Sequence, residues 1–157
     1  FFSWRPDPLA RATDAFLQIW PSSLLYAFPP FNLIARVLTH ARLHQSSLVL
    51  ITPFWQSQPW FPMALELSAQ IPILLPSFPD LLLNPVGHRH PLVLQSSLLL
   101  VAWKISALPG EPQEFRKKLV NSSSSLGPQV PQNSTSLLGS LGVIGVWAGV
   151  QIPLQQM

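Results

Sequence analysis

Short apolar runs and longer runs with helical spacing alternate along the first half of the chain. Residues 24–28 (LLYAF) and 47–52 (SLVLIT) are mostly apolar, and a proline stops each run, which predicts two buried strands. Residues 32–43 between them have the period of an amphipathic helix, and residues 9–20 predict a shorter helix ahead of the first strand. The apolar stripe of the longer helix consists of Leu33, Ile34, Val37, Leu38 and Ala41.

The same alternation continues to about residue 106. Residues 59–69 predict a further helix, whose prolines fall in its first turn, and residues 71–75 predict another strand. Residues 98–105 form an apolar run that suits either a helix or a strand. Because strands alternate with helices, we expect the α/β class. The few elements fit the second half of a doubly wound domain, so residues 1–106 are expected to be an incomplete, Rossmann-like half-domain.

The composition changes after Ser106. Residues 121–136 (NSSSSLGPQVPQNSTS) are rich in Ser, Asn, Gln and Pro, so we expect a flexible linker over residues 107–136. Residues 137–157 form an apolar tail with regularly placed glycines, which we expect to be a loosely ordered edge or linker. The most apolar part of this tail, Leu137–Val150, has 14 residues, fewer than the ~18 of a membrane span, which disfavours a membrane partner.

The charged content of the chain is low. Asp, Glu, Lys and Arg make up 10% of the 157 residues, against about 25% in an ordinary globular protein, while 48% are hydrophobic. Such a chain can build a core but has little solubilising surface, which is typical of a piece of a larger protein. It begins at Phe1 without a signal-peptide pattern, so we expect a cut from a longer reading frame and an intracellular location, in the cytoplasm or the nucleus. The absence of cysteine excludes disulfides, thiolate zinc sites and cysteine nucleophiles.

The most specific motif is Phe28-Pro29-Pro30-Phe31, directly after the first predicted strand. It resembles the motif of N6-adenine methyltransferases, in which Asp or Asn, two prolines and an aromatic residue stand at the end of a strand. There the Asp or Asn side chain and a backbone carbonyl accept hydrogen bonds from the amino group of a flipped adenine, and the aromatic ring stacks on the base. Phe28 occupies the acceptor position and has no lone pair to offer. The resemblance implies a degenerate site without catalytic residues, and the simpler interpretation is a proline turn after a strand.

A longer set of motifs resembles the segment after RNase H in the Pol polyproteins of DIRS-type, tyrosine-recombinase retrotransposons. That segment is itself similar to phage-type Dam adenine methyltransferases. The matching motifs lie in order between residue 1 and about residue 120. They are SWRPDP (3–8), DAF (14–16), YAFPPF (26–31), QPWFP (58–62), DLLLNP (80–85), HPL (90–92) and AWK (102–104).

The resemblance implies a methyltransferase-like half-domain within a longer polyprotein. Reverse transcriptase and RNase H would precede it, and the tyrosine recombinase would follow the tail. The glycine-rich turn that binds AdoMet is absent from this sequence, so no cofactor is expected, although an intact site would use AdoMet. We therefore expect an inactive relic of an AdoMet-dependent DNA adenine methyltransferase-like domain, with the rest of the Pol polyprotein as its partner.

Basic and aromatic side chains support a second hypothesis. Arg116, Lys117 and Lys118 form the main basic cluster, and the rings of Trp55 and Trp60 are able to stack on bases. These residues would make the chain a non-catalytic, nucleic-acid-contacting connector between RNase H and the recombinase. A solvated basic segment and tryptophans that pack under the sheet are the simpler interpretations. A third hypothesis is a membrane-associated peptide formed by the tail.

The remaining polar candidates have local interpretations. His40 and His44 have the i, i+4 spacing of a metal pair, but no third ligand is evident, so no metal site is expected. Asp14 suits the cap of a short helix. His88 and His90 lie in a loop that contains Gly and Pro.

Overall fold

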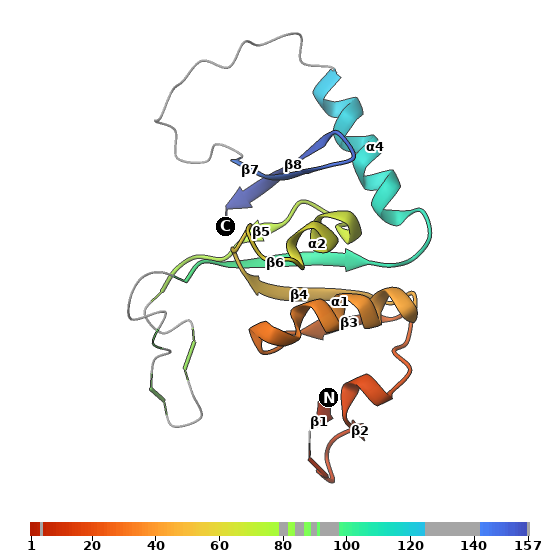
Figure 1. The fold of residues 1–157 in the computed structure, drawn as a ribbon, viewed down its shortest axis with the longest axis vertical. Coiled ribbons are helices and arrows are strands. Elements are labelled where there is room, and N and C mark those ends of the chain that lie inside the picture. The colour runs from red at the N-terminus through yellow and green to blue at the C-terminus, as the bar shows by residue number, and fades with distance from the viewer. Residues whose placement is uncertain are drawn as a thin grey trace.

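The computed structural model describes residues 1–3, 5–78, 82–83, 87–88, 91, 98–124 and 142–156. Its N-terminal elements are β1 (Phe2–Ser3), β2 (Ala12–Thr13) and the 3-10 turn η1 (Ala15–Leu17). The central elements are β3 (Leu24–Ala27), the 3-10 turn η2 (Phe31–Leu33), α1 (Ile34–Leu43), β4 (Ser47–Pro53), α2 (Phe61–Leu67) and β5 (Ile73–Leu74). The C-terminal elements are β6 (Leu100–Ser106), α4 (Glu111–Ser124), β7 (Gly142–Trp147) and β8 (Val150–Gln156), as Figure 1 shows.

A six-stranded mixed sheet, in the order β3-β4-β6-β5-β8-β7, organises the fold. β3 and β4 are parallel and are connected through α1, as a strand–helix–strand unit requires. β6 runs antiparallel to β4 from the pair Ser47↔Ser106 to the pair Pro53↔Leu100. β5 is antiparallel to β6 and parallel to β8, and β7 and β8 form an antiparallel hairpin. The α/β class is confirmed, with a mixed sheet in place of a wholly parallel one.

The hydrophobic core lies between the sheet and the two helices α1 and α2, which cover the front of the sheet in Figure 1. Trp103 of β6 is fully buried in this core, and its Nε1 donates a hydrogen bond of 2.9 Å to Thr52 Oγ1 on β4. This bond gives two polar groups a partner in an apolar environment, where an unpaired group would be costly. The other fully buried members of the cluster include Ile34, Leu38, Leu48, Leu50, Val101 and Ile105.

The predicted strand–helix–strand unit is confirmed with small shifts in its boundaries. β3 stops one residue before Phe28, η2 and α1 together cover residues 31–43, and β4 extends the predicted strand by one residue to Pro53. α2 and β5 lie within the predicted helix and strand that follow. The apolar run at 98–105 becomes the strand β6 because it pairs with β4 on one side and with β5 on the other.

The helix predicted for residues 9–20 is wrong. β2 and η1 occupy this stretch, and its apolar side chains Leu9 and Ile19 are exposed. Asp14 adopts a positive φ of 51°, which interrupts any continuous helix. Its carboxylate accepts a hydrogen bond of 2.9 Å from the backbone N–H of Phe16, so the predicted capping role of Asp14 is confirmed.

The C-terminal region is more regular than its composition indicates. α4 occupies residues 111–124 of the expected linker 107–136, because good helix formers follow acidic residues in the first turn. β7 and β8 occupy most of the expected loose tail 137–157, and a two-residue turn with positive φ at Ala148 and Gly149 joins them. The linker and the loose tail are therefore corrected for these residues. Residues 125–141, which include most of the serine- and glutamine-rich stretch, lie outside the described residues.

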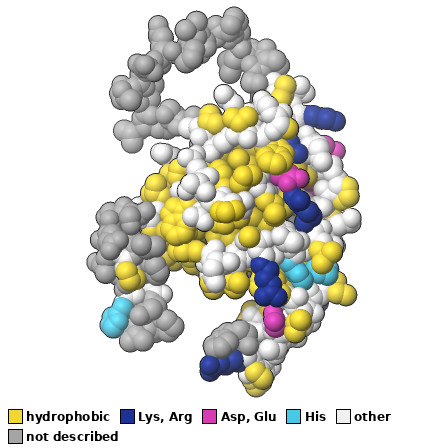
Figure 2. Space-filling view, viewed as in Figure 1, with side chains coloured by type: hydrophobic (Ala, Val, Ile, Leu, Met, Phe, Trp, Pro, Cys, Tyr) yellow, Lys and Arg dark blue, Asp and Glu magenta, His cyan; other side chains and the backbone are white. Residues whose placement is uncertain are grey.

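The surface carries few charged side chains, as the composition of the sequence implies. Hydrophobic side chains cover much of the middle of the face in Figure 2, and charged side chains lie along its right side and at its lower end. Among the described helices, none has the length and apolarity of a membrane span. Leu24, Tyr26 and Phe28 are large hydrophobic side chains that remain exposed, and they lead directly to the double-proline motif.

Candidate functional site at the double-proline turn

The double-proline turn lies at the carboxyl end of β3, where the chain passes from strand to helix. Pro29 and Pro30 lack a backbone N–H, so β3 cannot continue its pairing through them. The chain then enters η2, in which the N–H of Leu33 donates a 2.8 Å hydrogen bond to the backbone oxygen of Pro30. α1 follows without a break. The motif is a stiff corner between strand and helix, as the sequence predicts.

A groove of about 600 Å³ runs beside β3 and reaches this corner. β3 and the residues after it as far as Pro30 form one wall, and the N-terminal residues Phe1, Phe2 and Phe16 contribute to the other. Among the described side chains that line the groove, that of Arg11 is the one that carries a full charge at neutral pH, and no carboxylate or side-chain amide is present. The groove therefore suits apolar groups.

Phe28 lines this groove from the position that the hydrogen-bond acceptor holds in the adenine methyltransferase motif. Its side chain is 39% exposed and carries no polar atom. A base placed here could pack against the ring, but its amino group would find no side-chain acceptor. The described lining of the groove adds no carboxylate or side-chain amide that could act as an acceptor in its place.

The two tryptophans that were candidates for stacking on bases pack against other aromatic rings of the chain. Phe31, the last residue of the motif, packs edge-on against Trp55, with ring centroids 5.1 Å apart. Trp60 is 5% exposed and lies beside Phe61 in the core, so its ring is closed to a stacking base. This burial corrects the nucleic-acid role considered for Trp60 and fits the packing interpretation. Trp55 is half-buried against the motif.

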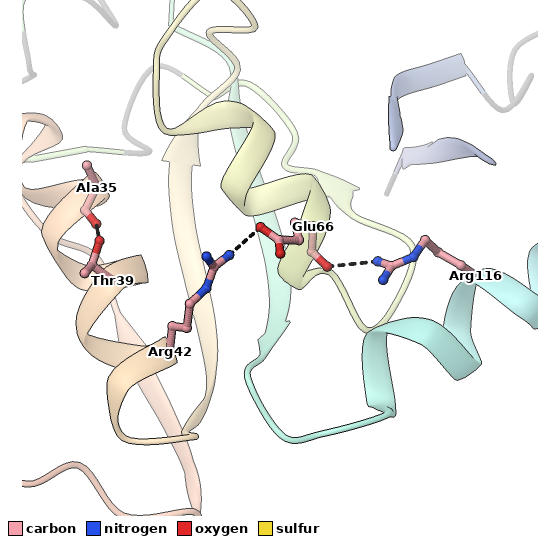
Figure 3. A network of polar contacts seen from close by, with 5 residues as sticks. All are labelled: Ala35, Thr39, Arg42, Glu66 and Arg116. Atoms are coloured by element: carbon pink, nitrogen blue, oxygen red, sulfur yellow. Dashed lines mark hydrogen bonds and ion pairs between the residues drawn. The ribbon is translucent and has the colours of Figure 1, made fainter. Parts of the chain in front are cut away.

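The basic cluster on α4 is divided between the interior and the surface. The Nη1 of Arg116 donates a 2.8 Å hydrogen bond to the backbone oxygen of Glu66 at the end of α2 (Figure 3). Burial lowers the pKa of the Arg116 guanidinium, and the nearby carboxylate of Glu66 acts in the opposite direction. Lys117 and Lys118 are exposed. Two of the three cations of this cluster therefore face the solvent.

Glu66 is a contact residue that the sequence reasoning missed. Its carboxylate forms an ion pair with Arg42 of α1, and its backbone oxygen accepts the hydrogen bond from Arg116 of α4 (Figure 3). The two arginines are 24 and 50 positions away from Glu66 in the chain, so no local pattern connects them. The network links three helices at the surface and has no reactive group beyond these charges.

The histidine pair has a packing role. The Nε2 of His40 lies 2.9 Å from the backbone oxygen of Gln18, and the ring of Trp20 packs edge-on against His40 at 4.7 Å. The rings of His40 and His44 are 4.4 Å apart. In the part of the chain that the structure describes, no group of three or more His, Cys, Asp or Glu side chains could hold a metal ion. His88 is exposed in its loop, and His90 lies outside the described residues.

Comparisons of the chain with protein-family models, with curated proteins and with solved structures found no match.

Proposed function

We propose that this chain is the second half of a methyltransferase-like α/β domain in the Pol polyprotein of a DIRS-type retrotransposon. In this role it is an inactive relic that acts inside the cell, in the cytoplasm or the nucleus. Its partners are the RNase H and recombinase parts of the same polyprotein. The order of the sequence motifs and the position of the double-proline turn in the fold support the proposal.

The observation that carries the proposal is the place of Phe28-Pro29-Pro30-Phe31 at the carboxyl end of β3. Open α/β sheets bind their ligands outside the carboxyl ends of the strands, at the point where the strand order reverses. From β3 the chain passes through α1 to β4 and then moves further from the free edge of β3. In the second half of a doubly wound sheet, the turn would stand beside the ligand.

The chemistry of the groove supports the loss of methyl transfer. An adenine amino group that leaves water needs acceptors, and each donor left unpaired costs about 1–3 kcal/mol. Phe28 supplies none, and the described lining of the groove adds no carboxylate or side-chain amide. The sequence also lacks a glycine-rich turn for AdoMet. No described residue of the groove completes a base site, and the sequence carries no glycine-rich cofactor turn, which supports an inactive chain.

A methyl-transfer assay tests the inactive role. We expect the purified chain to transfer no methyl group from AdoMet to duplex DNA that contains adenine, and its unfolding midpoint to stay the same with AdoMet. Phe28→Asp restores an acceptor, and Phe28→Leu is the matched apolar control. We expect both variants to be inactive, because the cofactor site is missing as well. Methyl transfer by the unmodified chain would overturn the inactive role, and transfer by Phe28→Asp alone would show that the acceptor was the one missing part.

The retrotransposon origin is tested on the DNA that encodes the chain. We expect many copies of the reading frame, with reverse transcriptase and RNase H coding upstream and a tyrosine recombinase downstream. A single-copy locus without either neighbour would contradict the proposed origin. This result does not depend on the enzymatic assay.

A further inference from the structure

β3 is an end strand of the sheet with one free edge. β4 is its one neighbour in the described sheet, through pairs that run from Leu24↔Ser47 to Ala27↔Leu50. Alternate backbone N–H and C=O groups of an end strand point away from its neighbour and remain available to another strand. Residues 24–27 contain no proline and no charge. The edge therefore has none of these usual features that prevent strand addition.

The side chains of β3 also indicate a missing neighbour. Leu24 and Tyr26, which lie on the same face of the strand, are 57% and 70% exposed. Neighbouring β4 and β6 are buried along nearly their whole length. The two side chains form an exposed apolar patch on the end strand, beside the groove, which an added segment would cover.

The groove beside β3 is bounded on its far side by the chain itself. Figure 1 shows β1 and β2 beyond β3, on the side away from β4. Phe1, Phe2 and Arg11 of this N-terminal segment line the groove opposite β3, while Val37 of α1 lines it from the helix layer. A second copy that presented its own β3 edge would meet this N-terminal wall. A single extended segment would lie between the wall and the strand.

We propose that this groove binds one extended, mostly apolar polypeptide segment, which pairs with the free edge of β3 as a seventh strand. The free backbone groups of β3 recur along the strand with the spacing that an extended chain matches. The apolar lining takes hydrophobic side chains at alternate positions of the segment. Arg11 has no ion pair with any described residue, so an acidic side chain on the segment complements it.

The first test uses a designed probe with the whole chain. The probe is a capped peptide of about eight residues in which valine alternates with threonine, and one threonine is replaced by glutamate. We expect saturating peptide to slow amide hydrogen exchange within residues 24–27 on the order of tenfold, and to leave β7 unchanged. The control peptide is N-methylated at alternate amides, which removes its strand-pairing donors. Equal slowing by both peptides, or no slowing by the first, would overturn the proposal.

The second test reverses the charge at the groove. Arg11→Glu should weaken binding of the glutamate peptide by about two- to fivefold and strengthen binding of a lysine version of the same peptide. Lys117→Glu, on α4, is the matched control because it changes the net charge equally at a residue outside the groove lining. Equal effects of the two substitutions would place the peptide outside the groove.

A second copy of the chain is the competing occupant, and sedimentation separates the two. If exchange within residues 24–27 slows as the chain is concentrated without peptide, and the chain sediments as a dimer, the single-segment proposal is overturned. The proposal rests on the edge and the groove alone. Binding of the peptide and absence of methyl transfer are therefore independent results.

Discussion

The two ends of the sheet are finished in different ways. At the β7 end, the hairpin partner β8 pairs with the strand, the register shifts between Val143 and Gly145, and α2 packs across it. At the β3 end, four residues form a regular edge beside an apolar groove. Bulges and covering elements are how sheets end without attracting a further strand. Each end strand has one neighbour among the described strands, but the edge of β7 is interrupted by a register shift, whereas the edge of β3 is regular and open to another strand.

The β7 end of the sheet is anchored to the core. An added Cβ at Gly145 would lie 2.7 Å from Cδ1 of Leu65, so α2 packs directly on the backbone of β7. The Nε2 of Gln56 donates a hydrogen bond of 2.9 Å to the backbone oxygen of Ile144. No comparable element covers Tyr26 among the described residues. The regular edge of β3, beside the apolar groove, is therefore the place to seek a partner.

The largest expected effect contrasts the sheet interior with the open edge. Trp103→Ala removes a fully buried ring and leaves the Thr52 hydroxyl without its donor, so we expect a loss of about 3–5 kcal/mol in the free energy of unfolding. Tyr26→Ala at the open edge should change it by less than about 0.5 kcal/mol. Urea unfolding measures both. A loss above about 2 kcal/mol for Tyr26→Ala would show that β3 is covered after all.

A smaller effect on stability is expected at the β7 end of the sheet, where two glycines of the same strand can be compared. Gly145→Val forces Leu65 to move within a packed contact, and we expect a loss of about 1–3 kcal/mol in stability. A Cβ added at Gly142 meets no atom within 4 Å, so Gly142→Val should leave the stability nearly unchanged. The same unfolding assay compares them. Equal losses would mean that α2 does not pack on β7 as described.

The ion pair between α1 and α2 should contribute less. Glu66→Gln removes the pair with Arg42 but keeps the backbone oxygen that Arg116 binds, so we expect a loss of about 0.2–1 kcal/mol that shrinks in high salt. Arg116→Met removes the other bond and should cost about 1 kcal/mol regardless of salt. Unfolding at low and high salt distinguishes them. A salt-dependent loss in Arg116→Met would contradict the division of roles.

The smallest expected effect concerns the nucleic-acid-contact alternative. Lys117 and Lys118 are exposed and Arg116 is held by Glu66, so replacing both lysines with alanine should reduce the slope of log affinity against log salt for duplex DNA by about 2. Arg116→Ala should leave this slope unchanged. A fluorescence titration at several salt concentrations measures it. A change of about 1 for Arg116→Ala would show that this side chain leaves the body of the molecule to bind phosphate.

The part of the fold that the sequence predicts is the part with local signals. Pro29 and Pro53 mark the strand ends, and the stripe from Leu33 to Ala41 marks α1. β6 could be identified only by its pairing with distant strands. α4 and the β7–β8 hairpin were obscured by the serine and glycine content around them, although the acidic start of α4 is a helix signal.

The candidate site also has a part that the sequence predicts and a part that it does not. The double-proline turn and the missing acceptor at Phe28 are evident in the sequence. The groove is not, because it combines the N-terminal segment with β3 and α1. The inward direction of Arg116 depends on Glu66, which is 50 positions away. Contacts of this kind arise from tertiary packing and leave no periodic pattern.

Amide hydrogen exchange of the free chain tests the open end of the sheet most directly. Alternate amides of residues 24–27 should exchange almost as fast as exposed amides, because no strand of the described residues covers that edge of β3. β6 has a strand on both sides, so its amides should exchange only when the whole chain unfolds. If all four amides of β3 are as protected as those of β6, the edge is covered and the description of an open sheet is contradicted.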